Sequence, residues 1–124
     1  MGRNFRNNKA WALADNLVVL VYRITKNFPK DELYGLVSQM RRSAISVPSN
    51  IVEGCARGSK KDYLRFLYIA LASLTELEYH FHLSKRLGFL NGINFQDLRN
   101  LQKETAYALN GLMKSVKDEL KNSD

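Results

Sequence analysis

The sequence contains one cysteine, two prolines and one tryptophan among its 124 residues. A single cysteine excludes an internal disulfide framework and any multi-cysteine zinc or iron–sulfur site. The longest aliphatic run, at residues 17–21, is far shorter than the roughly 20 residues that span a bilayer. The N-terminus carries Arg3 and Arg6 but no apolar signal segment, and Arg6 stands where a myristoylation signal has Ser or Thr. We therefore expect a cytoplasmic protein without a membrane segment.

Acidic residues are also few, with 12 Asp and Glu against 19 Lys and Arg. The formal net charge is +7 and the pI is about 9.7. Apolar residues make up 45% of the chain, which is typical of a globular protein and excludes a disordered basic tail. The length fits one domain over residues 1–124. The positive surplus indicates either simple solubility charge or an anionic partner, with nucleic acid as the first candidate.

Apolar residues recur at steps of three and four, and turn signals are few and widely spaced. This pattern predicts four helices and no strand, at about residues 9–27, 31–57, 60–87 and 95–120. Short connections make consecutive helices antiparallel, so we expect an all-α, up-down-up-down four-helix bundle. Pro48 lies within the apolar seam of the second helix, which stays in phase across it, so a kink is expected there rather than a break. That seam comprises Leu33, Val37, Met40, Ala44, Val47 and Ile51.

Two of the predicted helices carry more apolar surface than one bundle face needs. On residues 60–87 a second stripe that includes Tyr68 and Tyr79 lies about 100–120° from the core stripe. On residues 9–27 Trp11 and Tyr22 repeat this pattern. An apolar arc this wide needs partners on two sides, which predicts an oligomer. The alternative is that a kinked second helix wraps the third closely enough to bury both stripes.

Motifs for catalysis are absent. Residues 54–60 (GCARGSK) superficially resemble a phosphate-binding loop, but three residues separate the glycines instead of four and no strand precedes them. A turn between two helices explains this segment better. Cys55 is a small packing residue by its position beside the seam, and no serine nucleophile elbow occurs. We expect no enzyme activity, no catalytic residue and no cofactor.

The two histidines, His80 and His82, do not predict a metal site. They are two residues apart and therefore point to opposite sides of a helix. Glu76 and His80 share a face but would need further ligands from other helices. A solvated or interface pair is the simpler interpretation, and we expect no bound metal.

The predicted topology brings most of the positive surplus to one end of the bundle, where the first helix begins, the second turns into the third, and the fourth ends. Binding of phosphates there would release counterions and depend strongly on salt. The candidate nucleic-acid ligands are Lys9, Arg57, Lys60, Lys61, Arg65, Lys117 and Lys121.

Arginines of the second helix suggest an assembly role. Arg41 and Arg42 would pair with acidic groups across a subunit interface or grip phosphates, uses that suit the planar guanidinium. A surface pair between Glu53 and Arg57 is the simpler explanation for Glu53. The candidate assembly residues are Trp11, Tyr22, Arg41, Arg42, Glu53, Tyr68 and Tyr79.

The segments 34–44 (YGLVSQMRRSA) and 46–54 (SVPSNIVEG), followed by Arg57, closely resemble the signature of the 23S rRNA intervening-sequence proteins, a bacterial four-helix bundle family. Further matching segments, within about residues 9–90, are 11–14 (WALA), 28–32 (FPKDE), 66–70 (FLYIA), 73–78 (SLTELE) and 87–90 (LGFL). The resemblance implies an antiparallel bundle that commonly forms a homopentamer, and no catalytic residue. The family is also similar to accessory proteins of diversity-generating retroelements, which are basic pentamers that bind nucleic acid and a reverse transcriptase.

The leading hypothesis is a non-enzymatic oligomer that binds RNA or a ribonucleoprotein through its basic end. The alternative is a protein-interaction scaffold that makes no direct contact with nucleic acid, with the charge giving only solubility.

Overall fold

The computed structural model describes residues 3–122, and it confirms the predicted all-α class with four long helices and no strand within that range. The α-helices are α1 (Lys9–Thr25), α2 (Leu36–Cys55), α3 (Lys60–Arg86) and α4 (Gly92–Lys121). Two short 3-10 turns, η1 (Phe5–Asn7) and η2 (Lys30–Glu32), precede α1 and α2. None of the helices within residues 3–122 combines the length and apolar character that crossing a membrane requires.

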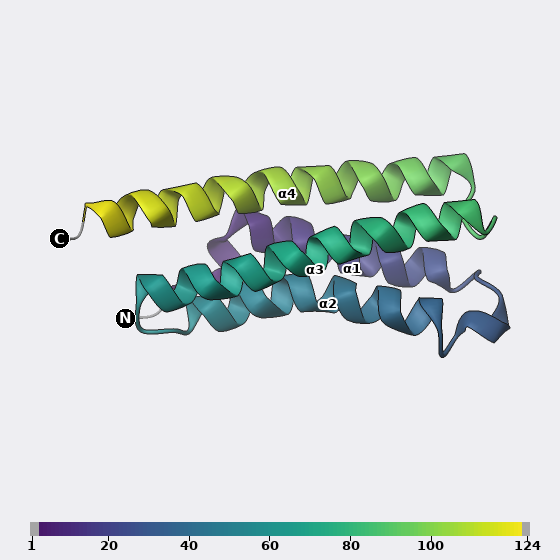
Figure 1. Cartoon of the computed structure of the whole chain (residues 1–124), viewed down its shortest axis with the longest axis horizontal. Coiled ribbons are helices and arrows are strands. Elements are labelled where there is room, and N and C mark those ends of the chain that lie inside the picture. The colour runs from purple at the N-terminus through teal and green to yellow at the C-terminus, as the bar shows by residue number, and fades with distance from the viewer. Residues whose placement is uncertain (1–2, 123–124) are drawn as a thin grey trace.

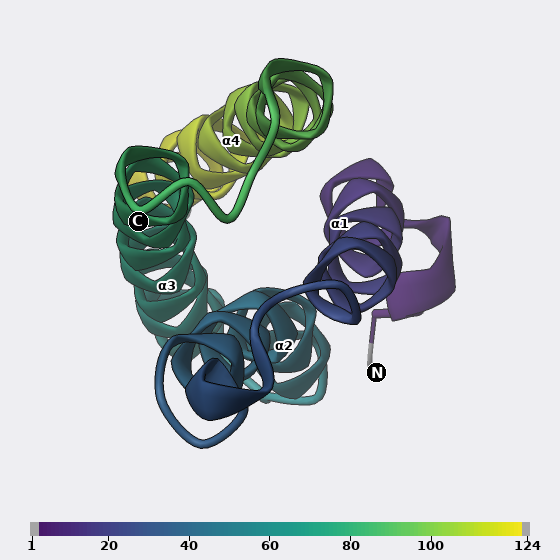
Figure 2. The ribbon, with the colours of Figure 1, turned by 90° about the vertical axis from the view of Figure 1, so that its right-hand side faces the viewer.

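Consecutive helices run in opposite directions along one long axis (Figure 1). Seen along that axis, the four helices follow one another around the bundle in chain order (Figure 2). Helices α1 and α3 each pack against both α2 and α4. Diagonal pairs make no comparable contacts among the described residues, so the core lies between the four helices.

Local side-chain caps explain where three of the helices begin. Asn8 accepts a hydrogen bond from the Trp11 N–H at 3.0 Å, and Ser59 accepts one from the Asp62 N–H at 3.1 Å. Asn91 accepts one from the Asn94 N–H at 2.7 Å, so α4 begins at Gly92, earlier than predicted. Such caps satisfy amide donors that have no partner within the helix.

A glycine closes the end of α3. Gly88 has a φ of +80°, a conformation that disfavours side chains with a Cβ. The Phe89 N–H donates to the Ser84 carbonyl at 2.9 Å and the Gly88 N–H to the Lys85 carbonyl at 3.0 Å. These two hydrogen bonds form a Schellman motif, which commonly ends a helix at a glycine in the left-handed conformation.

The predicted start of the second helix is wrong. Residues 30–35 form the 3-10 turn η2 and a further turn, and α2 begins at Leu36. The Glu32 carboxylate accepts a hydrogen bond from the Leu36 N–H at 3.2 Å, so Glu32 caps α2 from outside the helix. Leu33 therefore falls outside the seam and is 45% exposed. The first helix is also shorter than predicted, since α1 ends at Thr25.

The rest of the predicted seam of α2 is buried. Val37, Met40, Ala44, Val47 and Ile51 are each at most 3% exposed, and they face buried side chains of the other helices. Helix α2 continues through Pro48 to Cys55 without interruption. The kink expected at Pro48 stays a prediction.

Gly54 lies where α2 approaches α3 most tightly among the described glycines. A Cβ at this position would meet the Tyr63 ring at 2.9 Å and the Phe66 Cβ at 3.0 Å. The Tyr63 carbonyl, a backbone atom, would lie only 3.3 Å away. The hairpin between α2 and α3 therefore requires a residue without a side chain at this point.

We expect Gly54→Ala to lower the free energy of unfolding by about 1–3 kcal/mol, because the added methyl group overpacks the interface. The matched control is Gly111→Ala in α4, where a Cβ would have no neighbour within 4 Å. This control is expected to raise stability by up to about 1 kcal/mol through helix propensity. Urea unfolding followed by circular dichroism measures both, and equal stability of the two variants would contradict the assignment.

Candidate nucleic-acid interface

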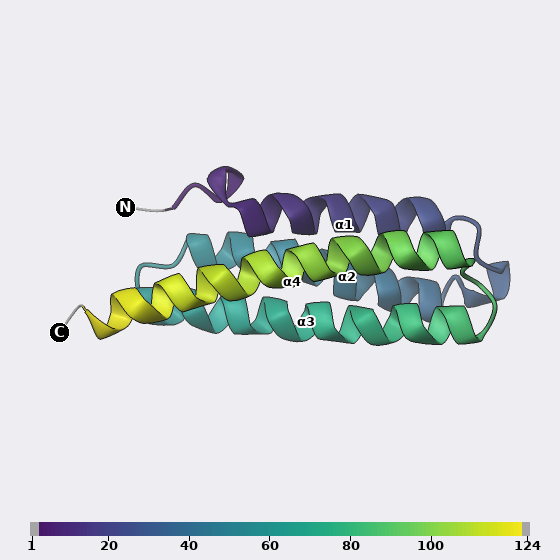
Figure 3. The ribbon, with the colours of Figure 1, turned by 90° about the horizontal axis from the view of Figure 1, so that it is seen from above.

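The chain brings three segments to the end of the bundle where basic residues were predicted to gather: the start of α1, the turn between α2 and α3, and the end of α4 (Figure 3). The segment before α1 contacts the turn between α2 and α3 at this end. The Arg3 N–H donates to the Cys55 carbonyl at 3.3 Å, and the Arg3 guanidinium lies 4.2 Å from the centre of the Tyr63 ring. Burial raises the pKa of Tyr63, whose hydroxyl accepts a hydrogen bond from Asn8 at 3.3 Å.

Three of the predicted phosphate ligands at this end already have acidic partners. Arg57 lies 2.9 Å from Glu53 and 3.7 Å from Asp62, and Arg65 lies 3.0 Å from Asp62. Lys60 pairs with Glu119 of α4 at 3.3 Å. Exposed ion pairs of this kind contribute roughly 0–1 kcal/mol each, so they order the turn while leaving the cations able to exchange partners.

Arg57 and Arg65 also pack around an aromatic ring. Their guanidinium groups lie 4.7 and 4.5 Å from the centre of the Phe66 ring. The Arg57 Nε is buried and forms no hydrogen bond with the described residues. Both arginines therefore stabilise the beginning of α3 as well as adding charge.

The other predicted ligands are more available. Lys9, Lys61 and Lys121 are exposed, and none has an ion-pair partner within residues 3–122. Lys117 is exposed as well, with its ammonium 5.0 Å from the centre of the Tyr68 ring. These four lysines come from α1, α3 and α4, so the fold gathers them from distant parts of the sequence.

The expectation that most of the positive surplus lies at this one end stays a prediction. The opposite end, where α1 and α3 finish and α2 and α4 begin, also carries basic residues, together with acidic residues that include Asp31, Glu32 and Asp97. Its exposed cations include Arg23, Lys26, Lys30, Arg42, Lys85 and Arg86. Both ends of the bundle therefore present exposed cations.

Several predicted assembly residues are engaged within the chain. The Arg41 Nε donates to the Thr25 hydroxyl at 3.0 Å, and the guanidinium lies 4.5 Å from the centre of the Tyr22 ring. Phe5 packs edge-on against Trp11 with ring centres 4.9 Å apart. Thr25, to which no sequence motif points, joins α1 to α2 through Arg41.

The remaining predicted assembly residues on α2 and α3 are exposed to solvent in the single chain. Arg42 is exposed. Tyr79 is 59% exposed and Tyr68 is 45% exposed, and both lie on α3 with the exposed Ile69. Helix α4 packs beside α3 and leaves this outer face uncovered in the single chain.

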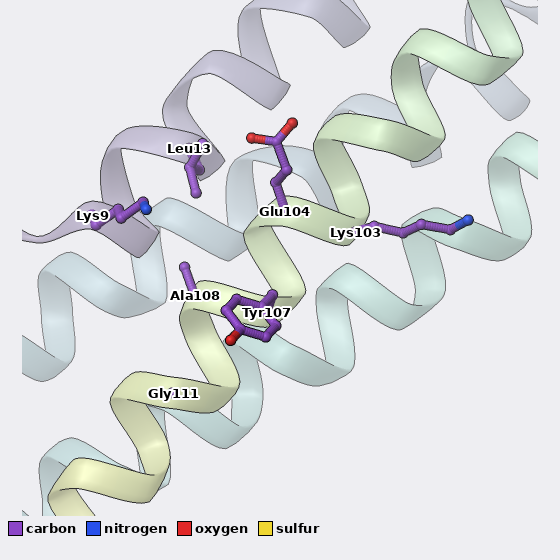
Figure 4. A pocket seen from close by; sticks show the side chains of 7 residues that line it. All are labelled: Lys9, Leu13, Lys103, Glu104, Tyr107, Ala108 and Gly111. Atoms are coloured by element: carbon purple, nitrogen blue, oxygen red, sulfur yellow. The ribbon is translucent and has the colours of Figure 1, made fainter.

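A shallow groove of about 490 Å³ runs between α1 and α4 (Figure 4). Leu13 of α1 and Ala108 and Gly111 of α4 line it, and the exposed Tyr107 stands at its side. Its charged lining residues are Lys9, Lys103 and Glu104. The groove therefore combines a small apolar floor with charged groups from both helices.

His80 is buried between α2 and α3, which the expectation of a solvated or interface pair did not anticipate. Its Nδ1 lies 3.2 Å from the Ser43 hydroxyl, and its Nε2 lies 3.5 Å from the Glu76 carboxylate. Within residues 3–122 no three His, Cys, Asp or Glu side chains cluster as metal ligands would. Burial lowers the pKa of His80, and the nearby Glu76 opposes that shift in part.

The lowered pKa of His80 predicts a loss of stability in acid. The unfolded chain takes up this proton near the usual pKa of 6.5, whereas the folded chain does so only at lower pH. Protonation therefore favours unfolding as the pH falls below about 6.5. We expect the free energy of unfolding to decline from about pH 7.5 to about pH 5, and His80→Gln to weaken that decline.

Urea unfolding at both pH values measures this effect. His82→Gln, which replaces an exposed imidazole on the same helix, is the control and should keep the pH dependence of the original chain. An unchanged slope in His80→Gln would contradict the role given to its burial.

Comparisons with known proteins agree with this architecture. The crystal structure of a protein of unknown function from the S23 ribosomal protein family of Bacteroides thetaiotaomicron superposes with a TM-score of 0.80 at 23% identity, over 86% of this chain and 96% of that one. No curated protein matches the chain. The family model described as 23S rRNA-intervening sequence protein matches residues 6–111. The chain therefore belongs to the 23S rRNA-intervening sequence protein family.

Proposed function

We propose that this chain is a non-enzymatic, cytoplasmic bundle protein that self-associates and binds RNA, alone or within a ribonucleoprotein. The observation that carries the proposal is the set of exposed lysines at one end of the bundle: Lys9, Lys61, Lys117 and Lys121. Flexible ammonium groups drawn from three helices suit a phosphate backbone, which is contacted through charge rather than through a fixed base pattern.

The paired arginines support this surface without being its main ligands. Arg57 and Arg65 share Asp62 and hold the beginning of α3 in place. Because these pairs are exposed, an arriving phosphate can replace the carboxylate at little cost.

For the RNA proposal, we expect the double variant Lys61→Glu and Lys121→Glu to weaken binding of a structured RNA hairpin. Each lost phosphate contact lowers the slope of log K against log salt by about 0.7–0.9. Fluorescence anisotropy across about 50–200 mM salt measures the slope. Lys30→Glu with Arg86→Glu, which replaces two exposed cations at the opposite end, is the charge-matched control and should bind with the original slope.

The same experiment separates this proposal from the scaffold alternative. If the chain fails to bind RNA at low salt, or if the double variant binds as tightly as the original chain, the basic end is not a nucleic-acid surface. The alternative, a protein-interaction scaffold, would then be favoured by the acidic partners that Arg57, Lys60 and Arg65 already have.

Self-association is proposed through the outer face of α3, where Tyr68, Ile69 and Tyr79 are exposed. Large apolar side chains gathered on one helix face are typical of surfaces that a partner covers. The family resemblance implies five copies arranged as a ring. A closed ring of identical copies would repeat the lysine surface around its axis and raise affinity for RNA through several simultaneous contacts.

For self-association, we expect the original chain to sediment as an oligomer at micromolar concentration. Ile69→Asp with Tyr79→Asp should shift it to a monomer, because a buried charge on each helix face opposes assembly. Ile93→Asp, which alters a 75% exposed residue of α4, is the control and should leave the mass unchanged. A monomeric original chain would contradict the proposal.

A further inference from the structure

A second surface lies far from the lysine end, along the outer side of α1 and α2. Two neighbouring grooves of about 480 and 460 Å³ share Tyr22 and Ile45 and so form one continuous depression. We call it the α1–α2 groove. Its lining residues include Val19, Arg23, Lys26, Tyr34, Arg42 and Ile45.

The floor of the α1–α2 groove is apolar and open to solvent. Val19 is 50% exposed, Ile45 is 41% exposed, and Tyr34 at one end is 92% exposed. Leu33 is exposed here because α2 begins later than its hydrophobic pattern predicts. A run of large apolar side chains left bare along two helices is typical of a docking surface.

The rim of the α1–α2 groove carries charge of one sign. Arg23, Lys26 and Arg42 line it and are exposed, and no Asp or Glu is among its lining residues. Glu32, which neighbours Leu33, turns its carboxylate toward the Leu36 N–H instead. The three cations have no ion-pair partner within residues 3–122.

We propose that the α1–α2 groove binds an acidic amphipathic helix of a partner protein. The apolar residues of that helix, spaced three and four apart, would pack on Val19, Ile45 and Tyr34. Its flanking Asp or Glu side chains would pair with Arg23, Lys26 and Arg42 at the rim, which fixes orientation and speeds association. This inference is independent of RNA binding at the lysine end.

Other occupants fit the groove less well. Single-stranded RNA needs flat aromatic surfaces for stacking, whereas the floor is mainly aliphatic and the Tyr22 ring already packs against Arg41. A second copy of this chain would have to offer acidic side chains beside an apolar helix face. On α3, Asp62 and Glu78 are paired with Arg57 and Arg99. Glu76 is the exposed acid of α3 without a Lys or Arg partner within residues 3–122, so that face offers one such carboxylate rather than a row.

The test uses two synthetic peptides of about four helical turns. Both carry Leu at positions i, i+3, i+4 and i+7, with Glu at the other positions in one and Lys in its twin. We expect the Glu peptide to bind and the Lys twin to bind at least about tenfold more weakly, as measured by titration calorimetry at low salt. Equal affinity for both peptides, or binding of neither, would overturn the proposal.

The place where the Glu peptide binds is tested by NMR of methyl groups and by matched variants. Adding the Glu peptide should shift the methyl signals of Ile45 and Val19 but not that of Ile93, which lies on α4. Arg42→Glu and Ile45→Ser should each weaken binding about tenfold. Arg86→Glu and Ile93→Ser, exposed residues outside the groove, should not.

The remaining outcomes are equally decisive. If Arg42→Glu leaves peptide affinity unchanged, the rim does not recognise acids. If Ile45→Ser lowers the sedimentation mass of the free chain, a second copy occupies the groove instead. If the same variant lowers RNA affinity while Lys61→Glu and Lys121→Glu do not, the groove is the nucleic-acid surface, and both this inference and the proposed site at the lysine end fail.

Discussion

Small side chains along α2 bring its backbone close to α3, and the position of the other helices follows from this contact. Ser46 and Ser73 meet at 2.8 Å between the two helices, and Gly54 gives the closest approach at their turn. Helix α3 packs against α4 as well as α2, and α1 completes the bundle by packing against both α2 and α4. The contact therefore decides which apolar residues are buried and which form the exposed outer face.

The same contact accounts for the dense polar residues of α2. Ser43 bonds back to its own helix and also faces His80, while Asn50 donates to the Ser46 carbonyl at 2.7 Å. Buried polar groups are tolerated when they have partners of this kind. These residues therefore stabilise the packing of α2. Arg42, one turn before Ser46, is exposed and can contact another molecule.

The sequence was sufficient for the helix class and for features set by neighbouring residues. Ser59, Gly88 and the pair of Glu53 with Arg57 depend on residues within one or two turns, and local spacing predicts such contacts. The start of α2 was not predictable in this way, because Leu33 continues the apolar period although Glu32 caps the helix at Leu36. Contacts across the bundle, such as Lys60 with Glu119, join distant segments and depend on the tertiary arrangement.

The N-terminal segment and the end of α4 lie at the same end of the bundle, beside the exposed lysines (Figure 3). Arg3 is bound to the turn between α2 and α3, so the described part of the chain begins beside that turn. An affinity tag at either terminus would thus crowd the lysine surface and alter its local charge. The loop at residues 87–91 projects from the opposite end and is the better place for a label or a tether.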